Sequence, residues 1–264
     1  MTTTQNDHAG LKIEVMTLAE TPRDRLDAEA MAIYQIFGQR EAEFGFGANV
    51  VIEYPPITDP ADSRFLGDPI GHIAGRLERL DPDGRIGRVV VLTTFGQRLL
   101  APMTAAGYRA DQIDMPAGPD HTYAFTLDRD AGAARTLYLE AVDEADEKIR
   151  PGFVIKLTDA DGRLCGGACG SIHDRDGRRF AYLAMMTLVP GMPAGTGTML
   201  AGALFAALRQ QGVATVHLGT QTAGRFYEKI GFDVTHRLVR HLRTRVAADG
   251  RQIDDDLVML RMDL

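Results

Sequence analysis

Apolar positions in the first half of the chain follow strand-like and helix-like periods in turn. Short apolar runs predict strands at residues 12–16, 49–54, 86–92 and 123–127. Apolar residues spaced three or four apart predict helices over residues 25–43, 70–80 and 96–107. The sequence Asp81-Pro82-Asp83-Gly84 marks a turn before the third strand. This pattern is typical of an α/β protein.

The second half has the same pattern with more elements. We expect a helix over residues 131–145, followed by strands at 153–157, 164–172 and 180–188. Asp-x-Asp-Gly turns at 159–162 and 174–177 separate these strands and predict antiparallel hairpins. The remaining elements are a helix at 198–211, a strand at 213–218, a helix at 222–230 and a hairpin of 232–246 with 253–262.

A turn rich in proline and glycine, from Val189 to Thr198, leads directly into the helix expected at 198–211. Such a turn presents backbone N–H groups at the positive end of a helix, where phosphate or pyrophosphate binds. Gly195 and Gly197 lack Cβ, so a phosphate group can approach the main chain closely. A tight strand-to-helix connection without any ligand is the alternative interpretation of the same residues.

A weak internal repeat links the two halves. Residues 89–108 resemble residues 213–232, since both run from a strand through threonine and a helix to a glycine followed by an aromatic residue. The likeness is open to two explanations, a duplication or two unrelated strand–helix units. The first copy has no glycine turn of the kind at 195–197, so only the second is equipped for a phosphorylated ligand.

Composition narrows the classes of function. The 264 residues are 45% hydrophobic and 25% charged, with a net charge of −7 and a pI near 5.5. We expect no basic nucleic-acid surface and no membrane span, because no apolar run approaches about 20 residues. The polar N-terminus has no secretory signal pattern, so we expect a cytoplasmic protein. Cys165 and Cys169 are read as small core residues on one strand face rather than as metal ligands.

Two motifs in the second half resemble those of the GNAT superfamily of acyl-CoA-dependent N-acyltransferases. The family's cofactor loop, Arg/Gln-x-x-Gly-x-Gly/Ala, aligns with residues 192–197. A later family pattern aligns with Thr220, Ala223, Tyr227, Gly231 and Phe232. Met192 stands where the family has arginine or glutamine, and Thr220 stands where it has asparagine. The resemblance covers roughly residues 129–264, and the N-terminal half resembles a degenerate unit of the same kind.

The resemblance implies a GNAT-like, mixed, mostly antiparallel twisted sheet flanked by helices, with two tandem GNAT-like units as one possibility. It divides the chain into a degenerate or substrate-covering domain, 1–128, and an acyl-CoA-binding catalytic domain, 129–264. Acetyl-CoA or another acyl-CoA is the implied cofactor, and Tyr227 is the implied general acid that protonates the departing thiolate. The implied cofactor-binding residues are Met186, Thr187, Leu188, Val189, Ala194, Gly195, Thr196, Gly197, Thr198, Thr220 and Ala223.

The leading hypothesis is an N-acetyltransferase acting on a small amine or an amino-acid-like substrate. The alternative is a non-catalytic module that keeps the fold and binds acyl-CoA or has a regulatory role. A homodimer is compatible with either. The residues leave the general base open, and the candidates are Glu140, Glu144, His173, Asp174 and His217. The aromatic run Phe44-Gly45-Phe46 is a candidate for shaping the substrate pocket, or it belongs to the core.

Overall fold

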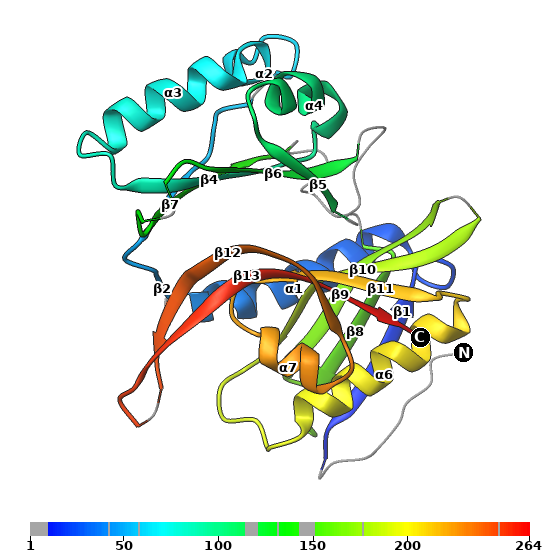
Figure 1. The fold of residues 1–264 in the computed structure, drawn as a ribbon. Helices are drawn as coiled ribbons and strands as arrows, with labels where there is room; N and C mark the ends of the chain where they lie inside the picture. Colours follow the sequence, from blue (N-terminus) through cyan, green and yellow to red (C-terminus); the bar gives the residue numbers. More distant parts are fainter. Residues whose placement is uncertain are drawn as a thin grey trace.

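A computed structural model describes residues 10–41, 43–57, 59–113, 121–130, 132–142, 151–175, 177–247 and 249–264. Strand pairing distributes this part of the chain over two sheets, one of eight strands and one of five (Figure 1). None of the helices among these residues is both long enough and apolar enough to cross a membrane.

The eight-stranded sheet has the order β1-β8-β9-β10-β11-β13-β12-β2. Its strands are β1 (Lys12–Thr17), β2 (Gly45–Phe46), β8 (Phe153–Thr158), β9 (Leu164–Arg175), β10 (Arg178–Leu188), β11 (Thr215–Thr220), β12 (Asp233–Val246) and β13 (Gln252–Asp263). Within the described residues β10 and β11 are parallel, and the other neighbours in this sheet are antiparallel. The mixed, mostly antiparallel sheet flanked by helices that the sequence implied is confirmed.

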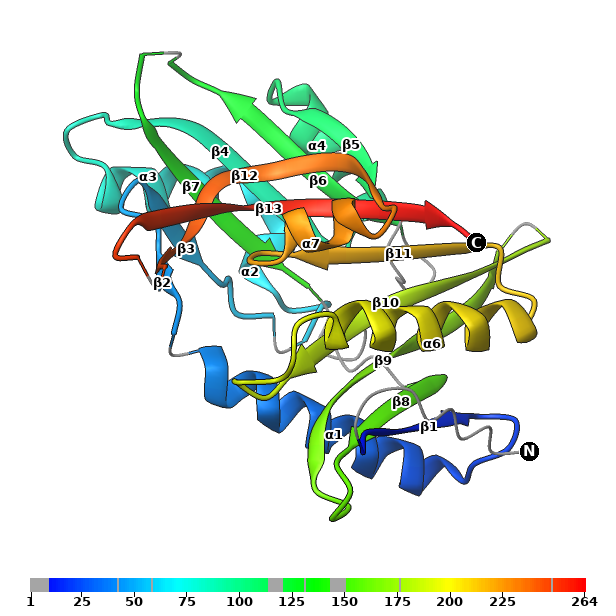
Figure 2. The same ribbon diagram turned by 90° about the horizontal axis from the view of Figure 1, so that it is seen from below.

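Two long helices cover opposite faces of this sheet (Figure 2). Along β8 successive side chains alternate between faces. Phe153 and Ile155 pack in one apolar cluster with α6 (Thr196–Gln210), whereas Val154 packs in another with α1 (Arg23–Glu41). The short helix α7 (Gly224–Lys229) also lies on the α6 side, since Tyr227 belongs to the same cluster. Both faces of the central strands are therefore buried.

The five-stranded sheet has the order β3-β7-β4-β6-β5. Its strands are β3 (Val50–Glu53), β4 (Ile86–Thr93), β5 (Arg109–Ile113), β6 (Thr122–Asp128) and β7 (Arg135–Ala141). One face carries α2 (Arg64–Gly67), α3 (Pro69–Leu80) and α4 (Gly96–Ala105) (Figure 1). The other face packs on the β12–β13 side of the first sheet, because Leu92 and Tyr138 share a cluster with Leu238 and Met259. The two sheets therefore pack against each other through this apolar cluster.

The prediction of a helix at residues 131–145 is wrong, because residues 135–141 form strand β7. β7 lies between β3 and β4 and runs parallel to both. Leu137, Tyr138 and Leu139 are all almost fully buried, as in a strand covered on both faces. The sequence of such a strand lacks the alternation of polar and apolar residues that marks a strand with one exposed face. Glu144 and the rest of 143–150 lie outside the described residues.

The internal repeat corresponds to a shared topology. In each copy a strand is followed by a helix and then by a hairpin whose second strand pairs beside the first: β4-α4-β5-β6 and β11-α7-β12-β13. Gly107 (φ +87°) and Gly231 (φ +107°) both take the left-handed conformation that ends a helix. The aromatic residues that follow them, Tyr108 and Phe232, are both buried.

Strand pairing also bears on the division of the chain. A break between residues 128 and 129 would separate β1 from β8, its antiparallel partner, and α1 from the cluster in which it packs. It would also remove β7 from the five-stranded sheet. In the order of the chain, the strands of the five-stranded sheet, β3 to β7, lie between α1–β2 and β8, and the division at residues 128/129 stays a prediction.

Candidate functional site

The parallel strands β10 and β11 separate near their carboxyl ends. Within the described residues their pairing is confined to Phe180–Tyr182 and Thr215–His217. The pairing of β10 with β9 shifts register between Leu183 and Met185, which marks a bulge, and then continues to Leu188. β11 continues beside β13 to Thr220. An opening between two neighbouring strands results, with the Met185–Leu188 edge of β10 on one side.

The N-terminus of α6 lies beside this opening. Gly195 precedes the helix with φ +91°, a conformation that glycine adopts at no steric cost. Among the described residues no side chain caps this helix start. At the start of α3, by contrast, the Asp68 carboxylate accepts the Gly71 N–H at 2.9 Å. The N–H groups at the positive end of α6 are therefore not taken up by a capping side chain of the described residues, so an anion can approach them.

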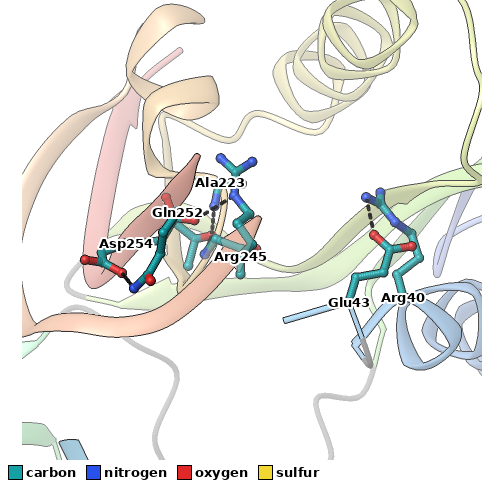
Figure 3. A network of polar contacts seen from close by, with 9 residues as sticks. Arg40, Glu43, Ala223, Arg245, Gln252 and Asp254 are labelled. Atoms are coloured by element: carbon teal, nitrogen blue, oxygen red, sulfur yellow. Dashed lines mark hydrogen bonds and ion pairs between the residues drawn. The ribbon is translucent and has the colours of Figure 1, made fainter. Parts of the chain in front are cut away.

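A cavity of about 620 Å³ lies at this helix start, and we call it the larger cavity. It is lined on one side by the β10 edge and the Gly195–Thr198 turn, and on another by α1 and β12. Its charged lining residues are Arg40, Glu43, Lys229 and Arg245. Figure 3 shows Arg40 and Glu43 on the α1 side and Arg245 on the side of the β12–β13 hairpin. Three cations and one carboxylate give this cavity a positive balance.

Arg40 ties α1 to the β10 edge. One of its terminal nitrogens donates to the carbonyl oxygen of Leu188 at 3.3 Å, and the other donates to the Glu43 carboxylate at 3.3 Å. Its Nε is buried and has no hydrogen-bond partner within the described part of the chain. A buried polar N–H without a partner is costly, so this atom marks a place where a polar ligand group would fit.

A second cavity of about 270 Å³, the smaller cavity, lies between the two sheets. Residues of β10, β11, β12 and β13 line it together with Leu92, Tyr138 and Glu140 of the five-stranded sheet. The residues that line both cavities are Phe37, Phe44, Met186, Thr222, Ala223 and Tyr227. They therefore meet at the opening between β10 and β11.

Three tyrosines, Tyr138, Tyr182 and Tyr227, line the smaller cavity. Burial raises the pKa of Tyr182 to about 12, and burial together with nearby Tyr182 raises the pKa of Tyr227 further above its usual range. Burial and then neighbouring Glu140 also raise the pKa of Tyr138. All three phenols keep their protons at neutral pH, so each can donate a hydrogen bond or a proton there.

The structure brings most of the predicted cofactor residues to one place. Those that line the larger cavity are Met186, Thr187, Leu188, Gly195, Gly197, Thr198 and Ala223, together with the predicted acid Tyr227. Three others lie beside it without lining it: Val189, Ala194 and Thr196. The Val189 N–H donates to the Cys165 carbonyl oxygen at 2.8 Å. Thr196 is buried, and its hydroxyl donates to the Pro193 carbonyl oxygen at 2.8 Å.

The Thr220 side chain forms hydrogen bonds within the protein. It lines the smaller cavity, and its hydroxyl oxygen accepts the N–H groups of Ala223 at 3.1 Å and Thr222 at 3.4 Å. These N–H groups lie at the start of α7, which has no other side-chain cap among the described residues. The threonine therefore orders the turn that presents Tyr227.

Of the candidate bases, only Glu140 among the described residues lines either cavity. His173 contacts the Ser171 hydroxyl at 2.6 Å and stacks on Phe180. Asp174 pairs with Arg179 at 3.1 Å, and the ring of His217 meets Phe180 edge-on at 5.6 Å. Glu144 lies outside the described residues.

The expectation that Cys165 and Cys169 share a strand face is wrong. Cys165 packs in the cluster on the α6 side, and Cys169 packs in the cluster on the α1 side. The pairing of β9 with β8 shifts register after Leu157, and Gly166 has φ +153°. One irregular residue reverses the alternation of side chains, so even spacing no longer means one face. Both thiols are buried, as expected, and burial raises the pKa of Cys169 to about 12.

Comparison with known proteins adds the following. No family model matches the sequence, and no curated protein matches it. Among solved structures, Naa50 of Arabidopsis thaliana in complex with a bisubstrate CoA analogue is 17% identical, with a TM-score of 0.33, over 42% of this chain and 72% of its own. The ribosomal-protein-S18-alanine N-acetyltransferase of Escherichia coli is 23% identical, with a TM-score of 0.31, over 42% and 67%.

A GNAT family acetyltransferase of Elizabethkingia anophelis, solved with acetyl-CoA bound, is 14% identical, with a TM-score of 0.33, over 42% of this chain and 76% of its own. The Elizabethkingia anophelis protein is described as a GNAT family acetyltransferase, and the Escherichia coli protein as an N-acetyltransferase. Identities and TM-scores this low assign neither a substrate nor a catalytic residue to this chain.

Proposed function

We propose that the protein is an acyl-CoA-dependent N-acyltransferase that transfers an acetyl or related acyl group to a small amine. The observation that carries the proposal is the junction of the two cavities at Tyr227. The larger cavity has the features of a site for a long phosphorylated ligand, and the smaller one is a confined space that a second substrate can enter. Tyr227 lies where the two ligands would meet.

The residues present fit coenzyme A. The uncapped N-terminus of α6 offers N–H groups to a diphosphate, and Arg40, Lys229 and Arg245 add positive charge around it. The edge of β10 at Met186–Leu188 offers backbone groups to an extended amide-bearing arm, as in strand addition.

Met192 does not weaken this fit. Its side chain packs against the apolar cluster below α6. The charge that an arginine would bring at position 192 is present instead on Arg40 and Arg245, which come from α1 and β12. The positive balance of the cavity thus depends on residues far from the loop in sequence.

When bound, an acyl-CoA supplies an activated thioester. The contribution of the protein is to hold the two reactants close together and to manage protons. The Tyr227 side chain is 6% exposed, and its raised pKa keeps the phenol protonated at neutral pH. A protonated phenol at the cavity junction is suited to donate its proton to a departing thiolate. The 270 Å³ of the smaller cavity favours a small amine over a folded protein as the acceptor.

The test is a pair of measurements on the purified protein. Acetyl-CoA should raise the melting temperature, since a ligand that binds only the native state stabilises it. A panel of small amines should then give thiol release from acetyl-CoA, and Tyr227→Phe should lower kcat by about 100-fold or more while the affinity for acetyl-CoA is kept. No thermal shift at millimolar acetyl-CoA would refute the cofactor assignment. Binding without thiol release would favour a binding module.

A further inference from the structure

Arg243 brings a buried positive charge to the smaller cavity. Its side chain is only 10% exposed, and among the described residues it is the one cation that lines this cavity. Arg243 and Arg245 are two positions apart in a part of β12 that pairs with β13 without a register shift, so both project from the same face of the strand. Arg245 lines the larger cavity instead. One strand face therefore supplies a cation to each cavity.

Three contacts hold the Arg243 guanidinium in a fixed orientation. Its Nε donates to the side-chain oxygen of Gln221 at 2.8 Å, and its Nη2 donates to the Glu41 carboxylate at 3.1 Å. One face of the group lies over the Phe46 ring, with 3.9 Å between the guanidinium carbon and the ring centre. A guanidinium that is already ordered loses little conformational freedom when it binds a ligand.

The other end of the guanidinium is free to bind. Arginine has five N–H donors, and the two hydrogen bonds occupy Nε and one N–H of Nη2. Among the residues that the structure describes, Nη1 has no hydrogen-bond partner. This nitrogen is also not one of the fully buried polar atoms without a partner, so it is open to a ligand. Nη1 and Nη2 together have the geometry that binds both oxygens of a carboxylate.

The two carboxylates on the lining of the smaller cavity do not take this place. Glu41 contacts Nη2, but its side chain is 53% exposed, so solvent screens much of its charge. Glu140 accepts the Tyr138 hydroxyl at 3.0 Å. An anionic group of a ligand is therefore bound best at Nη1 of Arg243.

Arg243 is also tied to the place where the two cavities meet. Its partner Gln221 directly follows β11 and precedes Thr222 and Ala223, which line both cavities. The same turn leads into α7 and Tyr227. Much of the remaining lining of the smaller cavity is apolar, and it includes Leu92, Leu183, Met185, Met186, Leu257 and Met259. Apolar surroundings strengthen a hydrogen bond between charged groups.

We propose that Arg243 binds the carboxylate of the acceptor, so that the acceptor is an amino acid or a similar small amine with a free carboxylate. This inference rests on the proposed acyl transfer and names its substrate class. An acceptor without the carboxylate leaves the donors of a buried guanidinium without a partner, which is the situation that gives strong discrimination. Leucine is a suitable probe, because its side chain matches the apolar lining.

The first test compares leucine with leucinamide, which has the same side chain but no carboxylate. In Arg243→Gln, kcat/KM for leucine should fall by about tenfold or more, while kcat/KM for leucinamide should hardly change. The ratio of the two values is compared between proteins, so the different basicity of the two amines cancels. Arg243→Lys keeps the charge but not the fork of donors, and it should retain part of the preference for leucine.

The second test measures binding of the two products and needs no turnover. In titrations with coenzyme A present, the wild type should bind N-acetylleucine about tenfold or more tightly than N-acetylleucinamide, and Arg243→Gln should bind both equally. Glu41→Gln keeps an oxygen for Nη2 and removes the competing charge, so its affinity for N-acetylleucine should be equal to or higher than that of the wild type. The matched control is Arg240→Gln, at an exposed position of β12 that lines neither cavity, which should leave both ratios unaltered.

Equal binding of the two products by the wild type would overturn the inference. So would an equal loss of activity toward leucine and leucinamide in Arg243→Gln, because that result indicates a structural role alone. If the wild type distinguishes the products but transfers an acyl group to no amine, the proposed function is refuted and the carboxylate site stands.

Discussion

Replacement of Arg245 by glutamine tests whether the larger cavity binds the phosphate groups of the cofactor. Arg245 lines that cavity from β12, and its Nε donates to the Asp255 carboxylate at 2.9 Å. The substitution removes the charge and leaves a shorter, uncharged polar side chain. It also leaves Asp255, whose side chain is only 12% exposed, without its cation. Both changes should weaken the binding of an anion.

The magnitude follows from the exposure of the group. A hydrogen bond to a charged partner contributes about 1.5–3 kcal/mol, which corresponds to roughly 10- to 150-fold in Kd. The Arg245 side chain is 35% exposed, so solvent and salt screen part of this energy. We therefore expect Arg245→Gln to raise the Kd for acetyl-CoA by about tenfold, with a weaker dependence of Kd on salt than in the wild type.

Isothermal titration with acetyl-CoA at low and physiological ionic strength measures both quantities. Asp255→Asn is the matched control, because it breaks the same ion pair but keeps the cation; its Kd should be equal to or lower than that of the wild type. A melting temperature for each variant shows that the fold is kept. An unchanged Kd and salt dependence in Arg245→Gln would show that the phosphates bind elsewhere.

Three further predictions concern stability and reactivity. Gly170→Ala should destabilise the protein by about 1–3 kcal/mol in denaturant titrations, because an added Cβ would lie 2.0 Å from the Tyr182 carbonyl oxygen. The control, Gly202→Ala on the exposed side of α6, should stabilise the protein by about 0.5–1 kcal/mol. Equal effects of the two substitutions would contradict the close packing of β9 on β10 at Gly170. Burial lowers the pKa of His173 below its ordinary 6.5, so at pH values just below 6.5 the unfolded chain binds this proton and the folded protein does not. The free energy of unfolding should therefore fall as the pH drops from 6.5 toward the lowered pKa. In His173→Gln the free energy of unfolding should change less steeply with pH over this range. The buried Cys169 thiol, with its pKa of about 12, should react with thiol reagents at pH 8 only after unfolding, and rapid labelling of the native protein would refute its burial.

Local signals in the sequence predicted the parts of the site that are contiguous in the chain. The Gly195–Thr198 turn, the helix after it and the spacing from Tyr227 to Phe232 all depend on neighbouring residues, and the structure places them together as expected. Strand β7 was misread because burial on both faces removes the alternation that marks a strand.

The charged residues of the two cavities had no local signal. Arg40 lies on a helix 148 residues before its partner Leu188, and Arg243 pairs with Glu41 across 202 positions. The pairing of β1 with β8 and of β2 with β12, together with the packing of α1 on β8 and β9, brings these residues to the second half of the chain. Glu140 was a candidate base by residue type alone, and its position became clear only when β7 was found to face the smaller cavity.

Hydrogen exchange with and without acetyl-CoA tests the central claim most directly, namely that the cofactor occupies the opening between β10 and β11. The account predicts slower exchange at two segments, Met186–Val189 on the β10 edge and Ala194–Thr198 at the start of α6, with little change along the helices of the five-stranded sheet. Protection confined to other segments, or no protection at saturating acetyl-CoA, would contradict it.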